Sequence, residues 1–408
     1  MNDTPRGSRL HIALFGRRNT GKSSLINTLT GQDIAIVSPV AGTTTDPVYK
    51  SMEILPIGPV VIIDTAGLDD EGELGRQRVS KSLGVLAKAD LVLLVVGHRQ
   101  GVGELERWLV DACRQTQQPV LGVINKIDLL PDPGDVGIPL PGIPWVKVSA
   151  RTGEGIDELK QAMIKLAPKE WTAPTIAGDL VPPGELALLV VPIDLAAPKG
   201  RLILPQVQTI RDLLDHDCLA MVVKERELKA ALSRLQKPPA LVITDSQAFL
   251  KVDADTPPGV PLTSFSILFA RYKGDLATLV EGALAVEDLQ PGDHVLIAEA
   301  CTHHRVADDI GTVKIPRWLR QAVGGELNFH WSSGIELPAG LESYKLIVHC
   351  GACMINRREM ISRIMAARAA GAPIVNYGVL IAYMHGILRR ALAPFPDVLA
   401  LLDENGVA

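Results

Sequence analysis

The sequence predicts an α/β protein whose first domain has a mostly parallel sheet and which continues into two smaller α/β domains. Short apolar runs alternate with segments of helical periodicity, which is typical of parallel sheets covered by helices. A glycine-rich phosphate-binding motif stands between an apolar run and a helical segment near the N-terminus. Segments rich in proline and glycine, 167–185 and 257–259, mark the domain boundaries.

The motif G-x-x-x-x-G-K-S occupies residues 16–23, between the strand-like run 12–15 and the helical segment 24–29. Its glycines let backbone N–H groups surround phosphate oxygens, and the helix N-terminus adds partial positive charge. We expect Lys22 to reach the β- and γ-phosphates and the Ser23 hydroxyl to bind Mg²⁺. The nucleotide-contacting residues predicted from this motif are Gly16, Asn19, Thr20, Gly21, Lys22, Ser23 and Ser24.

Further apolar runs predict the remaining strands of this sheet. They are residues 60–63, 91–96, 120–124 and 145–148, with helical segments at 103–114 and 156–166. Since the carboxyl ends of parallel strands meet at one edge, loops after these runs should line one site.

Polar motifs follow three of these runs. Asp64, in D-T-A-G, has the position of a carboxylate that reaches Mg²⁺, and the Gly67 N–H can contact the γ-phosphate. In N-K-x-D, Asp128 can accept hydrogen bonds from N1–H and the 2-amino group of guanine, and adenine lacks both donors. The predicted contacts on the base side are Asn125, Lys126, Asp128, Ser149 and Ala150. The four motifs resemble a GTPase of the translation-factor-related class and predict GTP.

Residues 42–46, G-T-T-T-D, resemble the switch I motif of the TrmE–Era–EngA GTPases. The resemblance implies that Thr44 binds Mg²⁺ and closes over the γ-phosphate. Leu68 stands where other GTPases have a water-orienting Gln, so another catalytic device is needed. The resemblance implies that Asn19 holds K⁺, which would offset developing charge, so Lys22, Thr44 and Asn19 form the predicted catalytic set. Bracing of the loop is the alternative role for Asn19.

Arg17 and Arg18 occupy variable positions of the P-loop. An arginine finger supplied by the same chain is conceivable for them. A solvated or protein-contacting role is favoured.

The composition excludes several classes of protein. The net charge is −5 and the pI about 6.0, so no general basic face for nucleic acid is expected. The longest apolar stretch, 374–388, is shorter than the ~20 residues of a membrane span. Five unevenly spaced cysteines do not suggest a disulfide framework. We therefore expect a cytoplasmic protein with reduced thiols and no membrane partner.

Cysteine and histidine gather after two strand-like runs of the last domain. The pattern is Cys301-x-His303, then 45 residues, then His349-Cys350-x-x-Cys353. Thiolates with imidazoles suit zinc or an iron–sulfur cluster. A structural zinc site would take four protein ligands, and a cubane cluster also needs four sites.

Joined to the GTPase motifs, this pattern resembles the HydF family of FeFe-hydrogenase maturation GTPases. The resemblance implies a 4Fe-4S cluster on Cys301, Cys350 and Cys353. It also implies a homodimeric scaffold that receives a di-iron precursor from the radical-SAM maturases HydE and HydG and delivers it to the hydrogenase apoprotein. The domains expected are a GTPase at 1–168, a dimerisation domain at 180–265 and a cluster-binding domain at 266–408.

The fourth cluster ligand stays open between Asp194, His303, His349 and an exchangeable group. Two rival interpretations remain. One is an RNA-acting GTPase of the Era and TrmE type, which predicts a basic C-terminal module absent from residues 266–408. The other is a GTPase with a structural zinc site.

Overall fold

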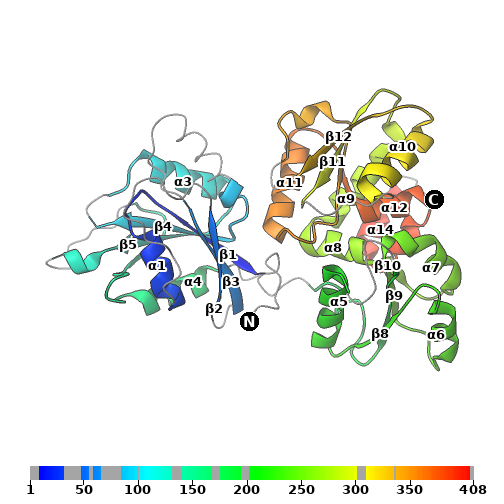
Figure 1. The fold of residues 1–408 in the computed structure, drawn as a ribbon, viewed down its shortest axis with the longest axis horizontal. Coiled ribbons are helices and arrows are strands. Elements are labelled where there is room, and N and C mark those ends of the chain that lie inside the picture. Colours follow the sequence, from blue (N-terminus) through cyan, green and yellow to red (C-terminus); the bar gives the residue numbers. More distant parts are fainter. Residues whose placement is uncertain are drawn as a thin grey trace. The chain divides into compact units, whose positions relative to one another are not determined.

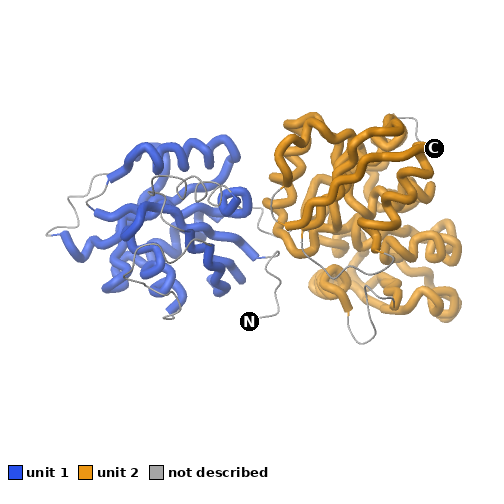
Figure 2. Tube along the Cα trace, turned by 45° about the horizontal axis from the view of Figure 1, so that its top comes forward, with its two compact units in different colours: residues 1–173 blue, residues 174–408 orange. Residues whose placement is uncertain are grey.

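The computed structural model describes residues 9–31, 47–54, 58–65, 84–98, 101–130, 140–167, 175–193, 202–300, 309–334 and 337–404. It divides into two compact units, residues 1–173 and 174–408 (Figure 2). Within the described ranges, no helix is long and apolar enough to cross a membrane.

The first unit is built on a six-stranded sheet with the order β2-β3-β1-β4-β5-β6 (Figure 1). Neighbouring strands are parallel except for β2, which pairs antiparallel with β3. The strands are β1 Leu10–Phe15, β2 Val48–Ile54, β3 Gly58–Asp64, β4 Leu91–Gly97, β5 Val120–Asn125 and β6 Trp145–Lys147. The mostly parallel sheet predicted from the sequence is confirmed.

Helices cover both faces of this sheet. On one face α1 (Lys22–Thr30) and α4 (Ile156–Leu166) share a hydrophobic cluster with Ile12 and Leu14 of β1. On the other face α3 (Glu104–Gln115) shares a cluster with Ala13 and Phe15. Because β1 is buried on both faces, its sequence is a continuous apolar run.

The second unit contains two four-stranded sheets with the orders β10-β9-β7-β8 and β12-β11-β13-β14, both parallel throughout. The strands are β7 Leu186–Val190, β8 Leu219–Val223, β9 Leu241–Thr244, β10 Leu262–Ser264, β11 His294–Glu299, β12 Asn328–Ser333, β13 Leu346–His349 and β14 Ile374–Asn376. The helices are α5 Leu204–Asp215, α6 Leu228–Arg234, α7 Phe249–Asp255, α8 Phe265–Lys273, α9 Leu276–Leu284, α10 Ile315–Val323, α11 Arg357–Ala369, α12 Tyr377–Met384, α13 Leu388–Leu392 and α14 Pro396–Glu404.

Both sheets of this unit belong to one hydrophobic cluster, which includes Leu188 of β7 and Val348 of β13. Two separate helices, α8 and α9, follow β10 in place of one continuous helix. A Cβ on Gly274 would lie 2.8 Å from a backbone oxygen of α8, and the Asp275 side chain caps α9. A side-chain cap favours a new helix start at this position.

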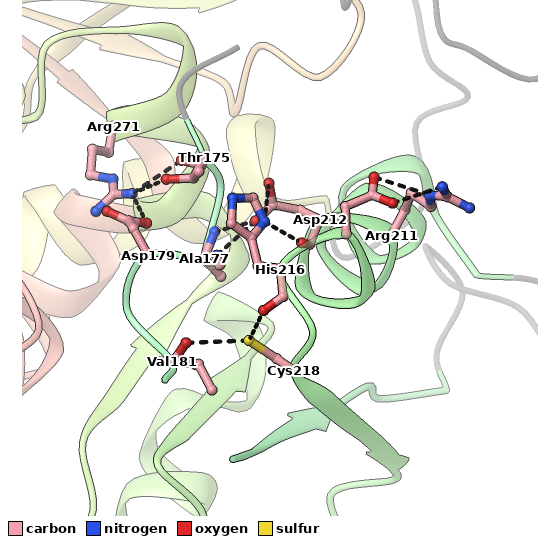
Figure 3. A network of polar contacts seen from close by, with 11 residues as sticks. Thr175, Ala177, Asp179, Val181, Arg211, Asp212, His216, Cys218 and Arg271 are labelled. Atoms are coloured by element: carbon pink, nitrogen blue, oxygen red, sulfur yellow. Dashed lines mark hydrogen bonds and ion pairs between the residues drawn. The ribbon is translucent and has the colours of Figure 1, made fainter. Parts of the chain in front are cut away.

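A polar network fixes the segment 175–181 at the start of the second unit (Figure 3). Arg271 of α8 donates from Nη2 to the Thr175 carbonyl oxygen at 3.0 Å and to Asp179 Oδ1 at 2.6 Å. Asp212 of α5 accepts from the backbone N–H groups of residues 177 and 178. The segment is therefore held by two helices, through one guanidinium and one carboxylate.

Candidate functional site

The P-loop joins β1 to α1, as the motif predicts. A Cβ on Gly16 would overlap the carbonyl oxygen of Val95, so only glycine lets the backbone lie this close to β4. Gly21 precedes α1 with φ 89°. Lys22 is buried, and its Nζ donates to the carbonyl oxygens of Gly16 at 2.8 Å and Arg17 at 3.0 Å. The lysine therefore lies across the loop that is expected to surround phosphates.

Ser23 and Asp64 form a pair suited to Mg²⁺. Ser23 Oγ donates to Asp64 Oδ2 at 2.7 Å, although the two residues come from different elements. Asp64 Oδ1 is buried and has no hydrogen-bond partner within the described part of the chain. Burial raises the pKa of Asp64, opposed by the Ser23 hydrogen bond and by the charges of Lys22 and Lys50. A hydroxyl beside a carboxylate with an unused oxygen fits a hard divalent cation.

Asn125 connects the P-loop to the two base-side motifs. Its Nδ2 donates to the Thr20 carbonyl oxygen at 2.9 Å. Its Oδ1 accepts from the backbone N–H groups of Lys126 at 2.8 Å and Ala150 at 3.0 Å. The Lys126 Nζ donates to the Asn19 carbonyl oxygen at 2.6 Å. The structure thus brings together predicted residues that are more than one hundred positions apart in the sequence.

Asp128 lies beside Ser149 at the base-side end of this site. Ser149 Oγ donates to Asp128 Oδ1 at 2.7 Å, and Arg151 Nε lies 3.2 Å from Asp128 Oδ2. The Asp128 side chain is only 9% exposed, whereas that of Arg151 is 77% exposed. Ser149 therefore holds one oxygen of the carboxylate in a fixed orientation, and the long, exposed side chain of Arg151 contacts the other oxygen.

Arg17 forms an ion pair with Glu106 of α3, with Nε 2.8 Å from Oε1 and Nη2 3.0 Å from Oε2. This guanidinium is therefore tied to α3 of the same unit. Asn19 is exposed and has φ 60°, a backbone conformation that asparagine tolerates better than most residues. Ser24 is the third residue of α1, and Thr44 and Gly67 lie outside the described residues.

The cysteine motif follows β13, beside β11. The two strands are parallel, and Ala298 is in register with His349. Ala300, the last described residue after β11, donates its backbone N–H to Cys350 Sγ at 3.2 Å. Cys350 and Cys353 are not disulfide-bonded. Burial raises the pKa of the Cys350 thiol, while the N–H groups of Ala300 and Ala352 lower it.

Both ring nitrogens of His349 have partners. Nε2 lies 2.8 Å from Arg363 Nη1, and Nδ1 lies 2.7 Å from the Cys350 carbonyl oxygen. Because a guanidinium has only donors, Nε2 accepts and Nδ1–H donates. His349 is fully buried, and burial together with Arg363 lowers its pKa to about 4.

Two basic residues at this site were not predicted from the sequence. Arg363 of α11 is 5% exposed and also donates to the Gly334 carbonyl oxygen at 2.7 Å. Lys273 of α8 is 1% exposed and contacts the loop that follows β13. Each lies in a helix with other charged residues, where a basic side chain is normally solvated, so no sequence signal distinguishes them.

The remaining predicted cluster ligands, Asp194, Cys301 and His303, lie outside the described residues. Within the described ranges, no group of three or more Cys, His, Asp or Glu side chains is placed to hold a metal ion. The donor set of the described part nevertheless fits an iron–sulfur cluster. Two thiols share one short loop, and one of them accepts a backbone N–H, a contact that tunes such clusters.

Comparison with known proteins gives relatives for the first unit. The tRNA modification GTPase MnmE of Nitrosomonas europaea is 41% identical over 171 residues, which is 42% of this chain and 37% of the relative. The MnmE of Bordetella petrii is 40% identical over 167 residues, 39% of this chain and 34% of the relative. The chain thus spans little more than a third of these curated relatives. A crystal structure of Aquifex aeolicus Era aligns with 60% of this chain and 99% of its own at 20% identity and a TM-score of 0.36.

Family models match three consecutive parts of the chain. Residues 11–126 match the 50S ribosome-binding GTPase family, which agrees with the geometry of the P-loop and its partner motifs. Residues 176–274 match the hydrogen maturase F dimerization domain, and residues 277–394 match the hydrogen maturase F tetramerization domain. The two maturase models together span more than half of the chain, and both matches lie C-terminal to the GTPase match. This chain belongs to the hydrogen maturase F (HydF) family.

Proposed function

We propose that this protein is a GTP-hydrolysing scaffold that binds a 4Fe-4S cluster and carries the di-iron precursor of the hydrogenase active site. The matches to a GTPase family and to two maturase domains support a HydF-type protein that hydrolyses GTP. The cluster, the exchange with HydE and HydG, and the delivery to the hydrogenase apoprotein are our proposal. Hydrolysis would take place in the first unit, where Lys22 and Ser23 meet Asp64.

The single observation that carries the cluster assignment is the contact between Ala300 and Cys350. It joins the end of β11 to the sulfur that follows β13. In the sequence Cys301 directly follows Ala300, so the third proposed thiolate ligand is one residue away from this contact. A cluster bound through Cys301, Cys350 and Cys353 would have a fourth iron site for another ligand.

For the fourth site we favour Asp194, His303 or an exchangeable group over His349. The reason is that the Nε2 lone pair of His349 is used by Arg363 and its Nδ1–H by Cys350. A displaceable fourth ligand would let the cluster bind the di-iron precursor and release it. His349 then has the role of orienting the backbone beside Cys350.

We propose that the homodimer forms through β8. This strand is at the end of its sheet and pairs only with β7 among the described strands. Leu219 and Val222 on β8 are 58% and 43% exposed, and Leu214 at the end of α5 is 54% exposed. An apolar edge strand presents unpaired backbone groups that a second copy can complete. The match of residues 176–274, which include β8, to a dimerization domain supports the formation of a dimer by this part of the chain.

We also propose K⁺ as the activating ion of hydrolysis, bound through Asn19. The exposed position of this side chain in the P-loop is compatible with that role. The thiols of a cluster scaffold must stay reduced, so a cytoplasmic location remains our expectation. Function on RNA is not favoured, because the MnmE relatives match only part of the chain and the rest matches maturase domains.

The test is iron and acid-labile sulfide analysis with EPR spectroscopy on anaerobically purified protein. We expect about four irons per chain and a reduced 4Fe-4S signal, both lost in Cys353→Ser. GTP hydrolysis should survive in that variant and should be lost in Lys22→Ala. One zinc per chain without sulfide would overturn the proposal in favour of a structural zinc site.

A further inference from the structure

Lys273 lies beneath the loop that carries two of the proposed cluster ligands. It is the last residue of α8, and its side chain is almost completely buried. Its Nζ donates to the carbonyl oxygens of Ala352 at 3.1 Å, Cys353 at 2.9 Å and Ile355 at 2.8 Å. An ammonium group has three N–H donors and no acceptor, so these carbonyls use all of its protons.

The loop needs such a restraint. Ala352 has φ 54°, in the left-handed region that residues with a Cβ rarely adopt. A backbone in this region persists where the surrounding contacts determine it. Since Lys273 donates to the carbonyl of Ala352 and to those of the next loop residues, it contacts the strained position directly.

Arg357 also connects the loop with α8, but here the donor lies next to the loop and the acceptors lie at the end of α8. It follows the loop, and its Nη1 lies 3.4, 3.0 and 3.1 Å from the carbonyl oxygens of Arg271, Tyr272 and Gly274 at the end of α8. Helix ends leave carbonyls without intrahelical partners, and Arg357 supplies donors for them. The loop and α8 are therefore connected by two basic side chains, one buried and one exposed.

We propose that Lys273 is a positioning residue for the iron–sulfur site, which holds the loop 350–355 in its ligand-presenting conformation and keeps a positive charge beside the cysteines. The inference rests on the proposed function. Thiolates and a bound cluster are anionic, and a buried cation close to them favours the anionic forms. Lys273 belongs to the dimerization-domain match and the cysteines to the tetramerization-domain match, so the site is completed across two family domains.

The test compares Lys273→Met with the native chain and with Lys345→Met, a control at an exposed lysine of the same unit. The first readout is hydrogen exchange of the apoprotein. We expect at least about tenfold faster exchange in residues 350–357 of Lys273→Met, with β11 and β13 still protected. The second readout is anaerobic reconstitution, where we expect less than half of the native iron and a more negative midpoint potential of any cluster formed. Lys345→Met should match the native chain.

Should Lys273→Met lose protection throughout β11 and β13, Lys273→Gln replaces it, because its amide keeps two donors. Native exchange and native iron content in a folded Lys273 variant would overturn the positioning role. Absence of iron in the native chain would instead overturn the proposed function, and with it the cluster role of Lys273. The iron content of the native chain therefore distinguishes a failure of the positioning role from a failure of the proposed function.

Discussion

The Arg363 guanidinium donates from Nη1 to Nε2 of His349 over 2.8 Å, with both side chains buried. This contact determines the tautomer of the imidazole, because Nδ1 must then carry the proton that bonds to the Cys350 carbonyl oxygen. The histidine in the cysteine motif is thus tied to α11 on one side and to the motif backbone on the other. In this arrangement both ring nitrogens of a histidine that the spacing suggests as a ligand already have hydrogen-bond partners.

Replacing Arg363 by Met should destabilise the second unit. The change leaves His349 Nε2 buried without a donor and removes the donor to the half-buried Gly334 carbonyl oxygen, which together cost about 2–4 kcal/mol. Calorimetry of the full chain can measure this loss. Because GTP stabilises only the unit that binds it, the unfolding transition whose midpoint GTP does not shift belongs to the second unit. Arg368→Met on the exposed face of the same helix should change stability by less than about 0.5 kcal/mol. Equal midpoints of thermal unfolding in Arg363→Met and Arg368→Met would contradict this prediction.

Much of the first unit could be predicted because its motifs are local. The P-loop, D-T-A-G and N-K-x-D motifs each follow an apolar run whose central residues are buried, so strand and loop are both visible in the sequence. The edge strand β12 was not predicted, since Asn328–Ser333 is largely exposed and has no apolar run. An edge strand whose side chains are mostly exposed lacks the two-sided burial that produces such a run.

The supports of the cysteine loop could not be predicted for a different reason. Lys273 and its partner carbonyls are 79 to 82 positions apart, and the partners are backbone atoms that every residue has. No residue type at the acceptor positions reveals the contact. The cysteines, by contrast, can be recognised in the sequence as candidate ligands, because thiol chemistry is specific to one residue type.

Asp128→Asn should reduce the affinity for GTP at least about tenfold, because the carboxylate accepts from guanine N1–H and the 2-amino group. Xanthine has a carbonyl in place of that amino group, so the asparagine amide should restore binding of xanthosine triphosphate. Titration with fluorescent nucleotides measures both. Asp157→Asn, at an exposed position of α4, is the control and should bind GTP normally. Unchanged GTP affinity in Asp128→Asn would remove the basis for guanine recognition.

Potassium dependence can be tested at Asn19 without straining the P-loop. Its φ of 60° suits glycine, so Asn19→Gly removes the side chain and keeps the backbone, whereas alanine would not. We expect native hydrolysis to be roughly tenfold or more faster in KCl than in NaCl, from charge stabilisation at the transferring phosphate. In Asn19→Gly the two rates should become equal while GTP still binds. Equal rates in the native protein would exclude the ion.

Val222→Lys should weaken the dimer by placing a charge on the edge strand β8. In a symmetric dimer the new lysine would face β8 of the second copy. Its ammonium group would then have to lose its hydration shell, or the two strands would not pair. Light scattering after size-exclusion chromatography should show the assembly reduced to half its native size. Leu250→Lys, at a 54% exposed leucine of α7, should leave the assembly unchanged. A native-sized Val222→Lys would place the dimer interface elsewhere.

His385 provides a test by pH. Its ring packs edge-on against Trp318 with centroids 5.1 Å apart, and burial lowers its pKa below the ordinary 6.5. As the pH falls below 6.5, the unfolded chain takes up a proton that the folded chain resists, so the stability of the second unit should decrease on acidification. NMR of ¹³C-labelled histidine should give a midpoint below 6.5 for the resonance that disappears in His385→Gln. Between pH 6.5 and the measured midpoint, the free energy of unfolding should decrease less in His385→Gln than in the native chain. A midpoint at or above 6.5 would mean that the contact with Trp318 stabilises the imidazolium, which the cation–π attraction of indole allows, and the sign of the pH dependence would reverse.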